Sequence, residues 1–531
     1  MARIINTSLT DPFSLKGFDR DQVYNGLDVC GTAEILAPML AQLDVITEPT
    51  YRFERDLQGP VLEMGLRGCL IDRHRKAAVI DEFWEHLEVL ERDLQRIVIE
   101  GVGMHEFNWR SPAHLRQLFY DELGLPTIRK QGRPTTDDAA REELEAYPIA
   151  TQIAKHINMM AELGKKLSVL RTEIDDDGRI RTSYNIAGTS TGRFSSSLSE
   201  FGTGGNLQNV EESLRSIFIA DHGYKFAKFD AKSGESYCVG ARIWNQFRDS
   251  RYLDAVESGD VHTAVARLIW PHLGWSGDLR HDKRLAETPF HRHYTHRFMC
   301  KKIGHGKNYK GGDNEIAIQT RLPINIIADF EPKYYGAFPG IPRWHEWVLD
   351  ELKTRRSLTT LTGRRRYFFK RPSDKKLLKE AIAYDPQGSL ADIVNQALLN
   401  IWRQDIAILM FQDHDALTFM YPERDEERVL PLLRDNLIVP LSLVGGRTLR
   451  IPYDCEVGWN KGHYHAERNP DGLREYAGPD DRRRRPQAGI LDRVVHRSDN
   501  KFRRTVDLST LDRDLGISRG GDAEGMGQDL K

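Results

Sequence analysis

Apolar residues recur three and four positions apart along much of the first third of the chain. Residues 52–68 and 83–100 carry this spacing, which is the pattern of a helix that buries one face. Ser111 followed by Pro112 is typical of a helix start. A further helix is expected over roughly residues 138–170, so this part of the chain is predicted to be largely helical.

Patterns typical of strands come later. Residues 224–231, YKFAKFDA, alternate apolar and polar side chains and end with the acid Asp230. Apolar runs at 406–411 and 416–421 flank a short polar segment, which predicts a β-hairpin. A closing strand is expected within residues 449–460.

The stretches between these segments are interpreted from their composition. The pattern is mostly helical up to about residue 350, and a helix is expected from about 376 to 411, after a basic turn at 362–372. Residues 181–210 are rich in Gly, Ser and Thr, as is typical of a surface loop. The polar, Gly-rich residues 463–531 are predicted to be a disordered tail.

Composition narrows the class of protein. A chain of 531 residues that is 40% hydrophobic can bury several cores, so several domains or subdomains are expected. It contains no run of about 18 apolar residues, so no membrane span is expected, and its first residues lack a signal peptide. Five scattered cysteines without a C-x-x-C pair favour reduced thiols and a cytoplasmic location over structural zinc.

The charge is distributed unevenly along the chain. A net charge of −2 gives no global indication of a nucleic-acid partner, but residues 301–312 and 353–379 are strongly basic. Basic segments interspersed with Tyr and Phe fit a surface that follows phosphates. Each segment taken alone fits a solvated charged face equally well.

The polar segment between the two apolar runs of the hairpin is Asp413, His414 and Asp415. On local grounds it is a turn, because Asp and His are ordinary turn residues. It is also a candidate metal site, because a carboxylate held by strands can ligate Mg²⁺. A second acid is needed, and Asp230 supplies it: two carboxylates on one sheet can hold two Mg²⁺ ions roughly 3.5–4 Å apart.

A basic stripe is predicted on the helix that contains RFMCKKIGHGKNY. It consists of Arg297, Lys301 and His305, spaced four residues apart, with Tyr309 at its edge. The cations can grip a triphosphate and the ring can stack on a base, although the same spacing fits an exposed basic helix. Gly304 and Gly306 weaken the helix by about 1 kcal/mol each, so a close approach to its backbone is expected there.

Four segments, in this order, resemble motifs of the family A DNA polymerases, the group of bacterial DNA polymerase I and many phage replicases. TGRFSS with GNLQN is similar to TGRLSS with PNLQN, and FDAKSGESY to D-Y-S-Q-I-E-L. RFMCKKIGHGKNYKG is similar to R-x-x-x-K-x-x-x-F-G-x-x-Y-G, and DHDALTF to V-H-D-E-L-x-F. The resemblance covers roughly residues 20–462. It implies an α+β right-hand polymerase fold, with an antiparallel palm sheet and mostly helical fingers and thumb.

The resemblance also implies roles for individual residues and identifies the partners as primer–template DNA and dNTPs. Asp230 and Asp415, with the Ala231 carbonyl, are expected to hold two Mg²⁺ ions, for which Mn²⁺ can substitute. Lys301 is expected to protonate the leaving pyrophosphate. The residues expected to contact the dNTP are Arg297, Lys301, His305, Tyr309, His262 and Glu235, of which Glu235 excludes a 2′-hydroxyl. The residues expected to contact DNA are Arg193, Gln208, Gln387 and His414.

Some positions depart from the family pattern. Ala416 replaces an accessory Glu, and His305 replaces the Phe or Tyr that stacks against the incoming nucleotide. Lys379 and Ala383 replace an Arg and an Asn that precede the position of Gln387. The first departure leaves the two-metal pair intact, whereas the others bear on nucleotide selectivity and template contacts.

By resemblance, the chain divides into consecutive parts. These are a segment like the end of a 3′–5′ exonuclease domain (1–50), an N-terminal palm segment and thumb (51–180), palm (181–240), fingers (241–395), palm (396–462) and a tail (463–531). In the first part, Tyr24 and Asp28 match a Y-x-x-x-D pattern. We interpret it as a relic of a phage-type enzyme without a complete exonuclease domain, as a docking helix, or as the docking site of a separate exonuclease chain. The chain alone is not expected to proofread.

Two alternatives to a DNA polymerase are considered. A single-subunit RNA polymerase has a related architecture, but a carboxylate at Glu235 would crowd a ribose. A non-catalytic nucleic-acid-binding protein would not need both Asp230 and Asp415. If the chain is encoded by a phage, the cytoplasm of the bacterial host is its expected location.

Overall fold

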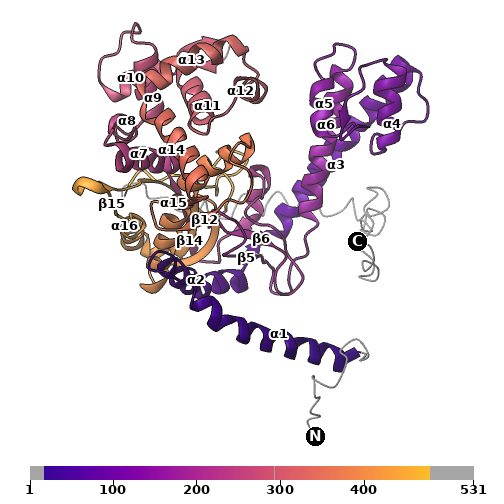
Figure 1. Cartoon of the computed structure of the whole chain (residues 1–531). Coiled ribbons are helices and arrows are strands. Elements are labelled where there is room, and N and C mark those ends of the chain that lie inside the picture. Colours follow the sequence, from indigo (N-terminus) through magenta and orange to yellow (C-terminus); the bar gives the residue numbers. More distant parts are fainter. Residues whose placement is uncertain (1–16, 292–293, 479–531) are drawn as a thin grey trace.

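The structure is a computed structural model that describes residues 17–291 and 294–478. A central antiparallel sheet is the base on which two helical regions stand (Figure 1). Helices α7–α14 gather on one side, helices α3–α6 form a separate lobe, and α1 (Gly17–Leu40) runs away from the body. Tyr24 and Asp28 both lie exposed on α1. Within the described part of the chain, no helix is long and apolar enough to cross a membrane.

The central sheet has five strands in the order β13-β14-β8-β17-β18, and every neighbouring pair is antiparallel. The strands are β8 (Tyr224–Ala231), β13 (Ile408–Asp413), β14 (Ala416–Pro422), β17 (Tyr453–Gly458) and β18 (Arg474–Glu475). Strand β8 therefore lies in the middle, although it comes first in the sequence. We call this sheet the palm.

The palm separates two hydrophobic cores, because successive side chains of a strand point to opposite faces. Phe229 and Phe419 face the core shared with α7 and α15 and make an edge contact with ring centroids 6.2 Å apart. Phe226 and Phe411 face the other core, shared with α3 and α6. Burying each such side chain stabilises the fold by about 1.5–3 kcal/mol. The alternation of side chains along each strand therefore fixes which face of the sheet each residue occupies.

We call the helices above one end of the palm the fingers. They are α7 (Gly234–Phe247), α8 (Arg251–Glu257), α9 (Val261–Ile269), α10 (Leu279–Ala286), α11 (His296–Asn308), α12 (Asp313–Thr320), α13 (Ile324–Ala337) and α14 (Gly340–Thr354). One hairpin, β9 (Pro289–His291) with β10 (Tyr294–Thr295), lies between α10 and α11. A second, β11 (Ser357–Thr359) with β12 (Arg365–Tyr367), follows α14. The long α15 (Lys375–Arg403) returns the chain to the palm.

We call the separate lobe the thumb. Helices α3 (Arg73–Arg96) and α6 (Thr151–Leu170) pack against each other along its stalk and carry α4 (Pro112–Arg116) and α5 (Asp138–Leu144) at its tip. Helix α2 (Thr47–Arg67) crosses beneath the palm and contacts α15 and β13. Asp72 caps α3 by accepting a hydrogen bond from the Arg75 N–H at 2.8 Å, which satisfies one of the free donors at the helix start.

The structure changes three sequence-based expectations about elements. The helix expected over 138–170 is two helices, α5 and α6, separated by a turn that contains Pro148. The helix expected over 376–411 ends at Arg403, and β13 begins at Ile408. In the predicted loop at 181–210, two short strands, β5 (Ser183–Asn185) and β6 (Ser195–Ser197), pair with each other.

The boundary of the predicted tail at residue 463 is also wrong. Strand β18 pairs with β17 through Glu456 opposite Glu475 and Val457 opposite Arg474, so it extends the palm. Leu473 is buried in the core beneath the sheet. The expectation failed because a short edge strand takes its stability from the neighbouring strand, and its own polar sequence gives little sign of it. The rest of the predicted tail, residues 479–531, lies outside the described residues.

Candidate active site

Strand register brings Asp230 and Asp415 to the same end of the palm. Strands β8 and β14 pair with Ala416 opposite Asp230, and the Ala231 N–H donates to the Asp415 carbonyl oxygen at 3.0 Å. The chain reverses between β13 and β14 through a two-residue turn, and His414 takes the left-handed conformation there with φ at +60°. The turn therefore holds Asp415 one residue beyond the strand that pairs with β8.

The two carboxylates differ in their surroundings. Asp230 is 55% exposed, and the nearest cation, Lys228, is 3.9 Å away. Asp415 is 34% exposed and accepts a hydrogen bond from Arg193 Nη2 at 2.9 Å. Loss of hydration raises the pKa of both carboxyl groups. The negative charge of Asp415 adds to the shift of Asp230, and that of Glu235 adds to the shift of Asp415. Both acids therefore favour a neighbouring positive charge.

Arg193 supplies a positive charge to Asp415 in this structure. Its Nη2 donates both to Asp415 and to Glu235 Oε1, the latter at 2.7 Å. The guanidinium therefore bridges the palm turn and the start of α7. Two neighbouring carboxylates attract a cation, so the arrangement fits a positively charged ligand at this position.

The helical stripe on α11 faces these acids across a cleft. Arg297 Nε donates to Asp260 Oδ2 at 2.9 Å, and its Nη1 lies 3.4 Å from Glu287. Lys301 is exposed and makes no ion pair with any described residue. The ring of His305 meets that of Tyr309 edge-on, with centroids 5.0 Å apart.

His262, on the neighbouring helix α9, lies next to this stripe. Burial lowers the pKa of the imidazole to about 4, and the positive charges of Arg297 and Lys301 contribute to the shift. His262 is therefore neutral near pH 7, so it can offer a hydrogen bond on this side of the cleft but no charge.

Tyr309 lies against Glu235, which lines the cleft. Its hydroxyl donates to Glu235, and burial together with the negative charge of Glu235 raises the pKa of that hydroxyl well above its usual value. The preceding residue, Asn308, is buried. Its side chain donates to the Tyr252 hydroxyl at 2.7 Å and accepts from Tyr334 at 2.8 Å, and its carbonyl accepts from His345 Nε2 at 2.7 Å. This network fixes the end of α11 from three sides.

The two glycines of α11 have a structural explanation. A Cβ at Gly306 would lie 2.9 Å from the Ile316 side chain, and one at Gly304 would lie 3.4 Å from the Tyr334 ring. The close approach expected from the sequence is therefore made by the packing of α12 and α13. This explains why α11 accepts residues that lower its intrinsic helix stability.

One cleft of about 650 Å³ collects most of the predicted residues. Those that line it are Asp230, Ala231, Glu235, His262, Arg297, Lys301, His305 and Asp415. Arg193 and Tyr309 reach the cleft through Glu235. Asp230 and Asp415 come from the palm, and Arg297 and Lys301 come from the fingers, so acids and cations face each other across the cleft.

The remaining residues predicted to contact DNA lie outside the cleft lining. Gln208 is 6% exposed, and its side-chain amide donates to the Gln412 carbonyl at 3.0 Å, so in this structure it supports the hairpin from beneath. Gln387 is half-buried on α15, and its side chain makes no hydrogen bond to other described residues. His414 is exposed at the turn.

Several residues at the site were missed by sequence reasoning. Asp454 lies opposite Asp230 on β17 and lines the cleft, and Asp260 holds Arg297. Beneath the turn that carries Asp415, the buried Lys461 forms an ion pair with Asp413 at 2.8 Å. For Asp260, the segment GDVHTA at 259–264 was the one sequence signal that could have indicated its role. Ion pairs between distant segments leave no periodic pattern in the sequence.

The donor set at the palm fits a divalent cation that keeps most of its own water. Among the described residues, no three His, Cys, Asp or Glu side chains are grouped to hold a metal. Asp230, Asp415 and the Ala231 carbonyl are all oxygen donors, the type that Mg²⁺ prefers, and Mg²⁺ is usually bound by one or two carboxylates with water and substrate phosphates as further ligands. The Arg193 guanidinium marks the same position as favourable for positive charge.

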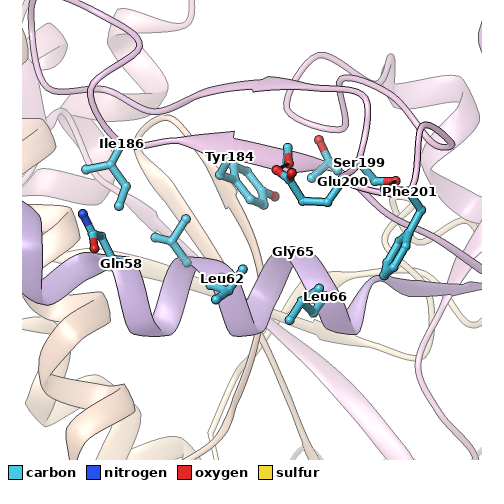
Figure 2. Close-up of a pocket in the computed structure, with 12 residues that line it drawn as sticks. Gln58, Leu62, Gly65, Leu66, Tyr184, Ile186, Ser199, Glu200 and Phe201 are labelled. Carbon is cyan, nitrogen blue, oxygen red and sulfur yellow. Dashed lines mark hydrogen bonds between the residues drawn. The ribbon is translucent and has the colours of Figure 1, made fainter. Parts of the chain in front are cut away.

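A second hollow, of about 260 Å³, lies between α2 and the segment 182–201 (Figure 2). Leu62 and Leu66 of α2 face Tyr184, Glu200 and Phe201 across it. None of the predicted site residues lines this hollow. It is mostly apolar, so it lacks the paired charges of the cleft between palm and fingers.

The fold and the cleft define a right-hand arrangement in which palm carboxylates face cations of the fingers. The chain matches DNA polymerase family A over residues 77–465 and belongs to that family. It is similar to the thermostable DNA polymerase I of Thermus aquaticus, with 28% identity over 430 residues, and to DNA polymerase I of Bacillus caldotenax, with 26% identity over 428 residues. These matches cover 76% and 78% of this chain but 47% and 46% of the relatives, so the chain spans about half their length.

A solved structure supports the same fold. The POL domain of Pol1 from M. smegmatis, in complex with DNA primer-template and dNTP, matches with a TM-score of 0.61 and 22% identity. The match covers 77% of this chain and 70% of that one. The α+β polymerase fold expected from the sequence is therefore confirmed, and enzymes of this family generally depend on divalent metal ions.

Proposed function

We propose that this chain is a template-directed DNA polymerase that adds dNTPs to the 3′ end of a primer. The observation that carries the proposal is the cleft itself, in which Asp230 and Asp415 face the α11 cations Arg297 and Lys301. Membership of DNA polymerase family A and the likeness to a polymerase domain bound to primer-template and dNTP support it. The cofactor is proposed to be Mg²⁺, with Mn²⁺ as a substitute.

In this proposal the palm binds the metals. Asp230, Asp415 and the Ala231 carbonyl would hold two Mg²⁺ ions, which when bound activate the primer hydroxyl and stabilise the leaving oxygen. Arg193 now bridges Asp415 and Glu235, so it has to release Asp415 when the metals bind. Its long, charged side chain is then available to a phosphate of the primer–template, together with His414 at the exposed turn. Gln387 is proposed to contact the template strand from α15.

The fingers bind the nucleotide in this proposal. Lys301, which has no partner among the described residues, grips the triphosphate and donates a proton to the leaving pyrophosphate. Arg297 binds the same phosphates in competition with Asp260 and Glu287. The neutral His262 contributes a hydrogen bond, and His305 lies against the base or sugar.

Sugar selection is proposed to rest on the contact between Glu235 and Tyr309. The Tyr309 hydroxyl holds the Glu235 carboxylate at the inner end of the cleft, where it fills the space that a 2′-hydroxyl would need. This favours a DNA polymerase over an RNA polymerase of related architecture. The retention of both palm carboxylates favours an enzyme over a non-catalytic nucleic-acid-binding protein.

Primer extension on a defined template tests the proposal. Purified chain is given a labelled primer–template with Mg²⁺ and either dNTPs or rNTPs. We expect extension with dNTPs that is lost on chelation of the metal and is far weaker with rNTPs. Extension that prefers rNTPs would identify an RNA polymerase, and DNA binding without any extension would identify a binding protein.

A further inference from the structure

The basic segment at 353–379 contains two kinds of cation. Three consecutive arginines at the turn and the start of β12 are all paired: Arg364 with Asp392 at 2.7 Å and with Glu54, Arg365 with Asp44 at 2.7 Å, and Arg366 with Glu380. The next four cations are Lys370, Arg371, Lys375 and Lys376, and all are exposed. None of these four has a carboxylate within 4 Å among the residues that the structure describes. The paired arginines anchor the hairpin, whereas the four later cations face solvent.

Two aromatic rings stand beside the unpaired cations. Phe368 is 3% exposed, packs against the Tyr384 ring at 5.9 Å, and its N–H donates to the Arg356 carbonyl at 2.8 Å. The rings on either side of it are exposed: Tyr367, the last residue of β12, is 54% exposed, and Phe369, beyond the end of the strand, is 87% exposed. The backbone between the two outer rings is therefore held by a buried anchor, so they are presented to solvent on a fixed support.

We infer that Tyr367, Phe369 and the cations Lys370, Arg371, Lys375 and Lys376 form a platform for single-stranded nucleic acid. An exposed ring offers a face on which an unpaired base can stack, and neighbouring cations can bind its phosphates. A duplex keeps its base faces stacked on one another, so it has no free face for Phe369. The charge and the rings together therefore favour a single strand over a duplex.

The position of the platform indicates which single strand it meets. A Cβ at Gly192 would lie 2.6 Å from the guanidinium of Arg364, so the turn of the hairpin touches the loop that carries Arg193. Arg193 in turn reaches Asp415. The inference rests on the proposed function: the strand is the unpaired template on its way to the cleft.

Fluorescence anisotropy with two labelled DNA probes tests the platform. One probe is a primer–template duplex with an unpaired template extension of about 10 nucleotides, and the other is the same duplex with blunt ends. We expect Phe369→Ala to weaken binding of the extended probe about tenfold and to leave the blunt probe unchanged. Phe369→Trp should retain tight binding. Replacing Lys370 and Arg371 with Ala should reduce the steepness of the plot of log K against log salt concentration by about 1.4 for the extended probe.

Phe201→Ala is the matched control, because Phe201 is a similarly exposed ring, 62% exposed, beside the α2 hollow. It should change neither affinity. Equal weakening of both probes by Phe369→Ala, or no change in either, would overturn the platform; the second result is expected if the patch instead meets an acidic protein. Failure of the wild-type chain to extend a primer would reject the proposed function, while a loss restricted to the extended probe would still support the platform.

Discussion

The palm and the fingers position their charges by different means. In the palm, Asp230 and Asp415 are far apart in the sequence and meet through the register of β8 and β14. In the fingers, Arg297 and Lys301 are one helical turn apart on α11, so local geometry alone aligns them. A change in strand pairing would therefore separate the acids, whereas the cations stay aligned wherever α11 remains a helix.

The two regions also share a feature. Asp415 is held by Arg193, and Arg297 is held by Asp260, so most of the charges that face the cleft already have an internal partner. A ligand has to exchange those partners for its own charges. Lys301 and Lys302, which both line the cleft, are exceptions, since neither makes an ion pair in the described part of the chain. If the proposed function holds, we expect the first contact with a triphosphate to be made by Lys301.

The largest effect is expected from breaking the palm pair. Asp230→Asn or Asp415→Asn should lower the rate of primer extension at least about a thousandfold, because each carboxylate is proposed to bind metals that act in the chemical step. DNA affinity should stay within a few fold, since binding rests mainly on phosphate contacts. Single-turnover extension and anisotropy measure the two quantities.

Asp454→Asn is the control for that experiment, because Asp454 lies opposite Asp230 on β17 and lines the same cleft. It should change the rate only a few fold. A loss as large as that of Asp230→Asn would show that the acidic cluster as a whole, and no specific pair, supports the reaction.

The next effect concerns the support of the palm turn. Lys461 is buried between Asp413, at 2.8 Å, and the Phe411 ring, 3.8 Å from its centroid, and burial lowers the pKa of its ammonium group. Asp413→Val or Lys461→Leu alone should lower the free energy of unfolding by about 3–5 kcal/mol, because each leaves one buried charge without a partner. Denaturant unfolding measures this.

The double variant with Asp413→Val and Lys461→Leu should recover most of that stability, since an apolar pair often replaces a buried ion pair at little cost. Two single losses that simply add in the double variant would show that the two residues act independently.

A smaller effect is expected on sugar selection, at the point where palm and fingers meet. Glu235→Ala should raise the use of rNTPs relative to dNTPs by roughly tenfold to a hundredfold, because it removes the side chain proposed to exclude the 2′-hydroxyl. Asn308→Leu should raise it by a few fold, because the end of α11 loses its hydrogen bonds to Tyr252 and Tyr334. Steady-state kinetics with single nucleotides gives both ratios.

Asn308 is expected to act through the contact of Tyr309 with Glu235. In that case the double variant with Asn308→Leu and Glu235→Ala should discriminate against rNTPs no less than Glu235→Ala alone. Fully additive effects would place Asn308 on a separate route.

The smallest effect is a pH dependence of stability from the fingers. Burial lowers the pKa of His345 to about 4, below its unfolded value of about 6.5. Between these two values the unfolded chain binds more protons, so His345 should make stability fall as the pH decreases from about 6.5 to about 4. Its contribution is fully present above about 6.5. His345→Gln should flatten this part of the stability curve, and an unchanged slope would show that other groups cause it.

Sequence patterns predicted the local elements that carry the chemistry. The alternation at 224–231 coincides with β8, the apolar runs around DHD form the β13–β14 hairpin, and the stripe that begins at Arg297 lies on α11. These succeeded because period-2 and helical spacing are local properties of a chain that buries one face. The motif order was sufficient to indicate the family, which the match over residues 77–465 confirms.

Only the tertiary structure decided how these elements meet. The ion pairs around the cleft join residues far apart in the sequence. Examples are Arg193 with Asp415 and Glu235, Lys461 with Asp413, and Arg364 with Asp392. Such pairs also divide the basic segment at 353–379 into paired arginines and unpaired cations. The same holds for β18, whose two polar residues form a strand only because β17 offers its edge. An ion pair or an edge strand depends on distances in space, and a one-dimensional pattern records periodicity but no distance between segments.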